Sequence, residues 1–508
     1  MIGVARHLDR KWAWLLLALI AALPVLVARV PDLSDMPNHL ARHHIFAMVG
    51  KGGPLDQYFL VHWRWIGNLG VDLPVMALAP WFGAEAATRL MAALIAPLTV
   101  LGILTLSRSV HGRVTASAML ALPFALSQPF VYGFLNYTLG VALALILSAW
   151  WLARPRRGPG TILVLVAASL VVWTAHIMGW AILLLIVGGA ELATLRNPRN
   201  LLASAIRLLP FFAPLVPLLL WRHQSAGPLF VFEDGWLSER ILNFLIVLKG
   251  LDRWFDIVMT AIVGVAAMLA FAWATAPRAA PRLAIPGLFL ALATLAMPGT
   301  VLGSWGADMR LAPVAVMIAI MAIGPAREPA REKALILIGL ALFAARVGYA
   351  AILWKQDSDV MERQLTMLDA VPRGSRMGFL FVRSDCDIPW RLTPDHKLGA
   401  YAIARRDVFS NTLFRIPGAD LMIARSMDDR AHWFDGSQDV PARCPQLGIN
   451  FSLLDIRMNA MAKAGFGTIW IKGVDSNRLV PPTGYRIVRS VPDNVLIAAI
   501  HPILRNRR

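Results

Sequence analysis

The sequence predicts a polytopic α-helical membrane protein with about eleven transmembrane helices, followed by a C-terminal soluble α/β domain. The chain has 508 residues, of which 57% are hydrophobic, and this is too apolar for an ordinary soluble enzyme. The apolar residues form runs of about 17 to 25, the length that crosses a hydrocarbon core of roughly 30 Å. Basic residues gather in every second connector between these runs, as the positive-inside rule expects of cytoplasmic loops.

The apolar runs place the spans in order along the chain. We expect them near residues 12–29, 86–107, 115–131, 136–153, 160–175, 177–195, 203–221, 256–276, 284–301, 309–324 and 335–353. A further apolar stretch at residues 73–82 contains Pro74 and Pro80 and is too short to span. It therefore predicts a helix that lies at the membrane interface or packs on the bundle.

The basic connectors also orient the chain. Because residues such as Arg108 and Arg278 lie in alternate connectors, the net charge of +18 reports topology rather than nucleic-acid binding. An odd number of spans after a cytoplasmic N-terminus places the C-terminal part outside. We therefore predict a transmembrane domain at residues 1–354, with a large first outer loop at 30–85, and a periplasmic α/β domain at 355–508.

The C-terminal region alternates helix-like and strand-like runs, which is typical of a small α/β domain. The helix-like runs lie at residues 360–370 and 396–406, and the strand-like runs at 377–382, 467–472, 485–491 and 494–501. Both cysteines of the chain, Cys386 and Cys444, lie in this region, where an oxidising compartment would let them form a disulfide. Two free buried thiols are the alternative.

The first outer loop places polar residues directly after the first span. If a short helix begins after Pro37, His39 and His43 share one of its faces and Arg42 lies beside them. The simpler interpretation is a solvated loop in which Asp35 caps the helix. The histidines could also bind a metal, but they come with no cysteine and no fixed ligand cage.

Ionisable residues also stand at the outer ends of later spans. Asp308 and Arg310 begin the tenth span, and His176 interrupts an apolar hairpin at its outward turn. Ionisable groups near membrane depth often line a cavity. The alternative for the charged pair is that it snorkels and fixes a helix end, and a histidine in an interfacial turn needs no function.

The segment Asp35-Met-Pro-Asn-His39-Leu-Ala-Arg42 resembles the Asp-x-Pro-x-His-x-x-Arg opening of poorly characterised bacterial members of the GT-C glycosyltransferase superfamily. The layout is similar over the whole chain, from the first span and its acidic outer loop to the soluble exported domain. Members of this superfamily take a sugar from a polyprenyl-phosphate or polyprenyl-diphosphate carrier on the outer face. The resemblance implies a multi-pass protein of a bacterial inner membrane, with its N-terminus in the cytoplasm and its C-terminal domain in the periplasm.

The resemblance also assigns roles to residues. In the superfamily an acidic residue of this loop acts as the base, which implies Asp35 here, with Asp32 as the substitute. A departing phosphate gathers negative charge, so arginine and histidine at the same depth should stabilise it. The candidates for binding the donor phosphate are His39, Arg42, His43, His176 and Arg310. Asn38 and Asp308 join Asp32 as acceptor-binding or accessory candidates.

These assignments predict an inverting hexosyl- or pentosyltransferase with a polyprenyl-phosphate-sugar donor and a lipid, glycan or protein acceptor. The absence of a Gly-rich phosphate loop from the sequence fits a lipid-linked donor rather than a nucleotide sugar. The spacing of Asp32 and Asp35 differs from the tight Asp-x-Asp pair of metal-using oligosaccharyltransferases, so a divalent metal cofactor is left open and no ligands are assigned to it. A transporter or flippase of lipid-linked sugars is the alternative, which would need charged groups along a path near the bilayer centre. A non-catalytic membrane scaffold with the same fold is another.

Overall fold

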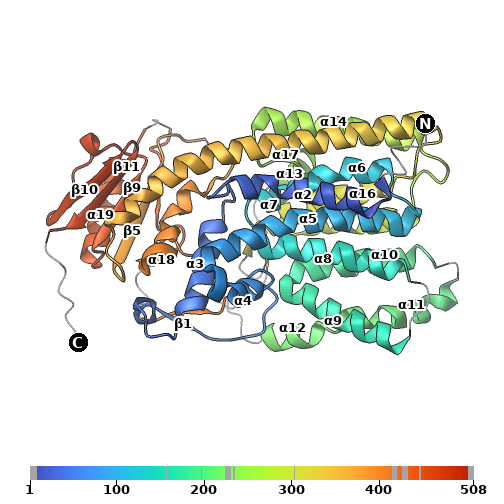
Figure 1. Cartoon of the computed structure of the whole chain (residues 1–508), viewed down its shortest axis with the longest axis horizontal. Coiled ribbons are helices and arrows are strands. Elements are labelled where there is room, and N and C mark those ends of the chain that lie inside the picture. The colour runs from blue at the N-terminus through green and yellow to red at the C-terminus, as the bar shows by residue number, and fades with distance from the viewer. Residues whose placement is uncertain are drawn as a thin grey trace.

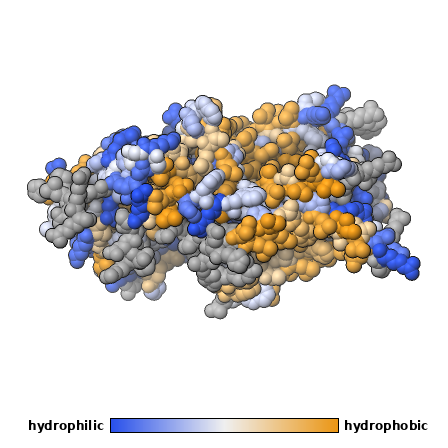
Figure 2. All heavy atoms as spheres, turned by 90° about the horizontal axis from the view of Figure 1, so that it is seen from below, coloured by the Kyte–Doolittle hydropathy of each residue, from blue (hydrophilic) through white to orange (hydrophobic). Residues whose placement is uncertain are grey.

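The computed structural model shows a long helical body that carries a β-sheet at one end (Figure 1). It describes residues 8–154, 158–195, 197–222, 230–232, 235–301, 304–387, 389–414, 420–425, 433–445 and 448–500. Hydrophobic side chains dominate the surface of the helical body, and hydrophilic residues gather toward the two ends of the long axis (Figure 2). This distribution is the one expected of a protein whose middle lies in lipid.

The helices follow the apolar runs of the sequence. They are α2 (Lys11–Val27), α3 (Met36–Met48), α4 (Asp72–Phe82), α5 (Ala84–His111), α6 (Ala116–Ala121), α7 (Gln128–Val131), α8 (Leu135–Leu152), α9 (Pro159–Ala175), α10 (Ile177–Leu192), α11 (Leu201–Leu208), α12 (Leu215–Arg222), α13 (Trp236–Leu245), α14 (Arg253–Trp273), α15 (Pro281–Ala296), α16 (Ala307–Met321) and α17 (Pro329–Leu365). Among the described residues, four helices are long and apolar enough to cross a membrane, namely α5, α8, α14 and α17 with its 3₁₀ extension. Shorter apolar helices of 10 to 17 residues accompany them.

Each predicted span coincides with helical structure, but two of the spans are interrupted. The predicted span at 115–131 is divided into α6, a 3₁₀ turn at Leu122–Leu126 and α7. The span at 203–221 is divided in the same way by a 3₁₀ turn at Leu209–Phe212. Pro123 and Pro210 lie in these turns, where a residue without a backbone N–H breaks the α-helical hydrogen-bond pattern. The number of helices that cross the membrane stays a prediction.

Glycines let the central helices approach closely. A Cβ atom at Gly179 of α10 would lie 2.8 Å from the Cα atom of Gly140 in α8. One at Gly339 of α17 would lie 2.6 Å from the backbone of Met119 in α6. Within lipid, the hydrophobic effect does not drive helices together, so their association depends on close packing. Small residues at such contacts allow the backbones to pack closely.

The C-terminal domain is built on a six-stranded mixed sheet. Its strands are β5 (Arg376–Val382), β6 (Phe409–Ser410), β8 (Asp439–Val440), β9 (Thr468–Lys472), β10 (Tyr485–Val491) and β11 (Asn494–Ala499). Their order is β10-β11-β9-β5-β6, with β8 also on β5, and β5 is parallel to β9 whereas β10, β11 and β9 run antiparallel. The four predicted strand-like runs are therefore strands of this sheet.

The C-terminal domain pairs with residues 30–85, which the sequence predicts to be the first outer loop. Strand β1 (Phe59–Val61) of the loop pairs antiparallel with β7 (Met422–Ala424) of the C-terminal region. Helix α18 (Tyr401–Arg406) packs against α3, and α19 (Phe451–Lys463) packs against β5. A disulfide links Cys386 and Cys444, whose Cα atoms lie 5.8 Å apart.

Candidate active site

Asp35 stands at the start of α3, but its side chain does not cap the helix. Its backbone amide donates to the carbonyl oxygen of Tyr132 at 3.0 Å. This approach requires Gly133, where φ is +80° and an added Cβ would lie 2.8 Å from the Asp35 nitrogen. The carboxylate is turned instead toward Lys397, whose Nζ lies 2.5 Å from Oδ1. The Asp35 carboxylate is thus part of an ion pair and not the solvated helix cap of the simpler interpretation.

Lys397 comes from the C-terminal domain, on a 3₁₀ helix at Pro394–Ala400. Its ammonium also lies 3.5 Å from the carboxylate of Asp435. Burial opposes the charge on Lys397, but the carboxylates of Asp35 and Asp435 outweigh it and raise the pKa of this lysine. Burial, with the Lys397 charge beside it, lowers the pKa of His396 to about 4. At neutral pH the domain therefore presents a fixed cation beside a neutral imidazole.

Helix α3 holds a second, buried group of polar side chains. Its i, i+3 spacing brings His39 and Arg42 together, with an Arg42 Nη2 to His39 Nδ1 distance of 3.3 Å. Arg42 forms an ion pair with Asp72 at 2.8 Å and donates to it at 2.9 Å. Burial, which would raise the pKa of Asp72, is outweighed by Arg42 and His43, so its pKa lies below the ordinary value. Burial lowers the pKa of His39 and of His43, so both are neutral at pH 7.

Arg310 approaches the same region from α16. Its guanidinium donates to Ser304 Oγ and to the Trp305 carbonyl oxygen, both at 3.0 Å, and lies 4.4 Å from the ring centroid of Phe134. Its Nε atom is buried without a hydrogen-bond partner in the described part of the chain. His176, between α9 and α10, lies edge-on to Tyr137 at 5.5 Å between ring centroids.

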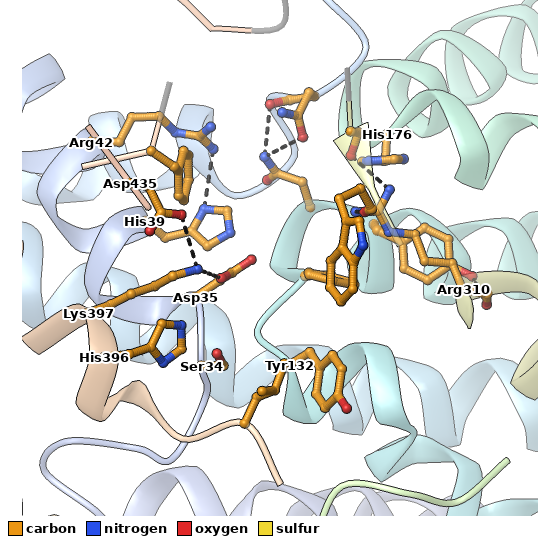
Figure 3. Close-up of a pocket in the computed structure, with 18 of the residues that line it drawn as sticks. Ser34, Asp35, His39, Arg42, Tyr132, His176, Arg310, His396, Lys397 and Asp435 are labelled. Atoms are coloured by element: carbon orange, nitrogen blue, oxygen red, sulfur yellow. Dashed lines mark hydrogen bonds and ion pairs between the residues drawn. The ribbon is translucent and has the colours of Figure 1, made fainter. Parts of the chain in front are cut away.

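These groups surround one cavity of about 400 Å³. Figure 3 shows Asp35, His39, Arg42, His396, Lys397 and Asp435 gathered on one side of it and His176 and Arg310 on the other. The remaining lining residues are Ser34, Asn68, Tyr132, Phe134, Asn136, Tyr137, Ser304, Trp305, Leu392, Phe414 and Phe434. Five residues predicted from the sequence thus meet here, although they come from three separate parts of the chain.

Four other candidates lie outside the cavity lining. His43 contacts Thr88 and Asp72 behind Arg42. Asp308 pairs with Arg240 at 3.2 Å, which makes it part of a helix-end ion pair.

Asn38 and Asp32 contact other parts of the chain. The Oδ1 atom of Asn38 accepts from the Phe414 amide at 3.3 Å. Asp32 is fully buried and lies 2.9 Å from Arg391. Burial raises the pKa of Asp32 to about 7 despite that arginine. Neither residue is among those that line the cavity.

Sequence reasoning missed the C-terminal contribution to the cavity. Residues Leu392, His396, Lys397, Phe414, Phe434 and Asp435 all come from that domain. Lys397 is 362 residues away from Asp35 in the sequence. The polar run from Asp395 to Lys397 is the available signal, but nothing local in it indicates a carboxylate partner. Within the described ranges, no three His, Cys, Asp or Glu side chains are grouped as ligands for a metal ion.

Comparison with known proteins finds likeness in structure and none in sequence. No protein-family model and no curated protein sequence matches the chain. The crystal structure of ArnT from Cupriavidus metallidurans in the apo state superposes with a TM-score of 0.55 at 12% identity, covering 96% of this chain and 97% of that one. ArnT from the same organism bound to undecaprenyl phosphate gives a TM-score of 0.54 at 11% identity, with the same coverage. The two folds agree over nearly their full lengths.

Proposed function

The chain has the GT-C fold, and on that premise we propose that it is an inverting glycosyltransferase that moves a sugar from a polyprenyl-phosphate donor to an acceptor at the outer face of a membrane. The observation that carries this proposal is the cavity in which the Asp35 carboxylate faces the buried guanidinium of Arg310. Glycosyl transfer needs a base for the acceptor and a cation for the leaving phosphate in one site.

Asp35 is the base of this reaction. An acceptor hydroxyl attacks the anomeric carbon, the bond from that carbon to the phosphate oxygen breaks, and the hydroxyl proton passes to the carboxylate. A single displacement of this kind inverts the anomeric configuration. Lys397 holds the carboxylate at the cavity wall through the 2.5 Å ion pair, which fixes the direction from which the hydroxyl must approach.

Arg310 is the cavity cation best suited to the donor phosphate. Of the three cationic lining residues, Arg42 is neutralised by Asp72, and Lys397 lies between two carboxylates. Arg310 has only neutral hydrogen-bond partners among the described residues and a buried Nε without such a partner. A charge-assisted hydrogen bond from Arg310 would strengthen as the phosphate gains charge. His176 and His39, which line the same cavity, can add neutral hydrogen bonds.

The lipid donor follows from the fold and the placement of the cavity. The similarly folded ArnT binds undecaprenyl phosphate, and the cavity is lined by residues of both the helical body and the C-terminal domain (Figure 3). We propose eleven transmembrane helices in a bacterial inner membrane, a cytoplasmic N-terminus and a periplasmic domain at residues 355–508. The contact between Lys397 and Asp35 supports placing the first outer loop and the C-terminal domain on the same side.

The test is transfer by the Asp35→Asn variant. Membranes that contain the full chain are supplied with polyprenyl-phosphate hexoses and pentoses, and sugar incorporated into lipid, glycan and protein is measured. Loss of a general base should reduce transfer about 10²- to 10⁴-fold, whereas undecaprenyl phosphate should still bind. The matched control is Asp455→Asn, on an exposed position of α19, which should transfer at the wild-type rate. Transfer by Asp35→Asn equal to that of the control would refute the assignment.

A further inference from the structure

A second, larger hollow is lined by other residues of α3 than those that line the candidate active site. Its volume is about 1060 Å³. It is bounded by the C-terminal half of α3, by α4, by the start of α5 and by α17 and α18. These elements meet where the helical body joins the C-terminal domain (Figure 1). We call it the α3–α5 groove.

The groove and the cavity of the candidate active site are separate. They share no lining residue. The cavity takes His39 and Arg42 from α3, whereas the groove takes His44 and the residues that end the helix. His43, which lies between these residues in the sequence, lines neither hollow and is hydrogen-bonded to Thr88 of α5 at 2.8 Å. The residues available to an occupant of the groove therefore differ from those around Asp35.

Positive charge predominates in the groove. Four of its side chains are arginine or lysine and two are glutamate. Glu85 is held by Arg405 through two hydrogen bonds of 2.7 and 3.2 Å, and Glu362 lies 3.8 Å from Arg29.

The remaining two cations of the groove are Lys51 and Arg89. Within the described part of the chain, neither has an ion-pair partner. Lys51 is exposed and Arg89 half-buried, so both ammonium and guanidinium are available to an anion that enters the groove.

Apolar side chains form the rest of the lining and its rim. Phe82, in the groove, and the adjacent Trp81 are 61% and 75% exposed. Leu90 and Leu94 continue an exposed apolar face down α5. An exposed tryptophan and phenylalanine beside a leucine face are typical of the level at which headgroups meet acyl chains. The α3–α5 groove therefore combines cationic side chains that can bind an anionic headgroup with an apolar surface along which acyl chains can lie.

We propose that the α3–α5 groove binds an anionic phospholipid of the outer leaflet. Its phosphate accepts from Lys51 and Arg89, and its acyl chains leave along Phe82 and the exposed leucines of α5. Since Arg405 and His44 also line the groove, the bound headgroup contacts both the first outer loop and the C-terminal domain. This site does not depend on the transferase assignment.

The experiment compares lipids with the purified full chain in detergent. Phosphatidylglycerol and phosphatidylcholine of the same acyl length are titrated, and binding is followed by native mass spectrometry and by the unfolding temperature. Phosphatidylglycerol should bind more tightly and stabilise the protein. Because each surface cation contributes about fivefold to binding an anionic lipid, the Lys51→Gln/Arg89→Gln variant should lose about 30-fold in affinity. Equal binding of the two lipids by the wild-type chain would overturn the proposal.

Further variants keep the result interpretable. Lys51→Arg/Arg89→Lys should bind as the wild type does, and Lys463→Gln, on α19 of the C-terminal domain, should have no effect. Glycerol phosphate without acyl chains should not compete with phosphatidylglycerol, and competition at equal concentration would contradict a lipid site. The double glutamine variant should still bind undecaprenyl phosphate, and loss of that binding would assign the groove to the donor instead.

Discussion

The ion pair between Lys397 and Asp35 should hold the C-terminal domain against residues 30–85, the predicted first outer loop. Lys397→Met removes the ammonium but keeps an unbranched side chain, and it leaves the carboxylates of Asp35 and Asp435 without their shared cation. An exposed ion pair contributes up to about 1 kcal/mol, whereas breaking a buried one costs about 3–5 kcal/mol. The Lys397 side chain is 12% exposed and that of Asp35 21%. The expected cost is therefore about 2 kcal/mol, a roughly 30-fold change in an opening equilibrium.

Hydrogen exchange of the backbone amides in the segment Pro394–Ala400 measures this opening. Exchange should accelerate about 30-fold in Lys397→Met and stay close to wild type in Lys397→Arg. The control is Lys355→Met, which removes an exposed pair with Asp359 and should leave this segment unchanged. In a double-mutant cycle, Asp35→Asn and Lys397→Met together should cost less than the sum of the two. Wild-type exchange in Lys397→Met, or full additivity, would refute the reasoning.

Three further perturbations test other parts of the molecule. Arg310→Ala should weaken undecaprenyl-phosphate binding about 10- to 100-fold, as expected for one lost charged hydrogen bond, and Arg310→Lys should recover part of the lost affinity. Native mass spectrometry measures this binding. Unchanged affinity in Arg310→Ala would show that Arg310 is not part of the phosphate site. Asp32→Asn should raise the unfolding temperature at pH 8 but not at pH 4. Burial raises the pKa of Asp32 in the folded protein to about 7 from 3.8. This carboxyl therefore destabilises the fold progressively as pH rises from about 4 to 7, by about 4 kcal/mol at the upper limit. A larger increase in unfolding temperature at pH 4 than at pH 8 would contradict this pH dependence. Gly339→Ala should lower the unfolding temperature, because its Cβ would lie 2.6 Å from Met119 and overpacking costs about 1–3 kcal/mol. The control Gly348→Ala, on the same helix, meets nothing within 4 Å and should not lower it. Equal effects of the two variants would show that helix propensity alone is responsible.

Local patterns predicted most of the secondary structure because they report local physics. The run predicted as a strand at 485–491 is strand β10 with the same limits. The runs at 115–131 and 203–221 are predicted as continuous spans because apolar residues predominate in both. The structure interrupts both at turns that contain proline, since hydropathy does not register a lost backbone donor. Helix α19 was not predicted, because its Ser, Asp, Arg and Asn residues dilute the apolar period.

The candidate site was predictable where its residues share one element. His39 and Arg42 meet because three residues separate them on one helix. The partner of each charge was not predictable, since Asp72 and Lys397 come from distant parts of the chain. These ion-pair partners determine which cation in the cavity is not already paired with a carboxylate. From sequence alone, Arg42 and Arg310 are equivalent candidates for a phosphate, and only the structure shows that the first already holds a carboxylate.

The buried charges of the helical body also bear on the choice between an enzyme and a transporter. A carrier of lipid-linked sugars would need ionisable groups that exchange partners along a path through the membrane. Arg346 donates to Asp256 and to two backbone carbonyls, and Glu332 accepts from two backbone amides. These groups, among the described residues, are saturated by fixed partners and therefore fasten helices to one another. Arg310 differs, because its partners are neutral and it lines the cavity that contains Asp35. The proposed phosphate-binding cation and the proposed base therefore line one cavity, which favours the proposed transfer on one face of the membrane over passage across it.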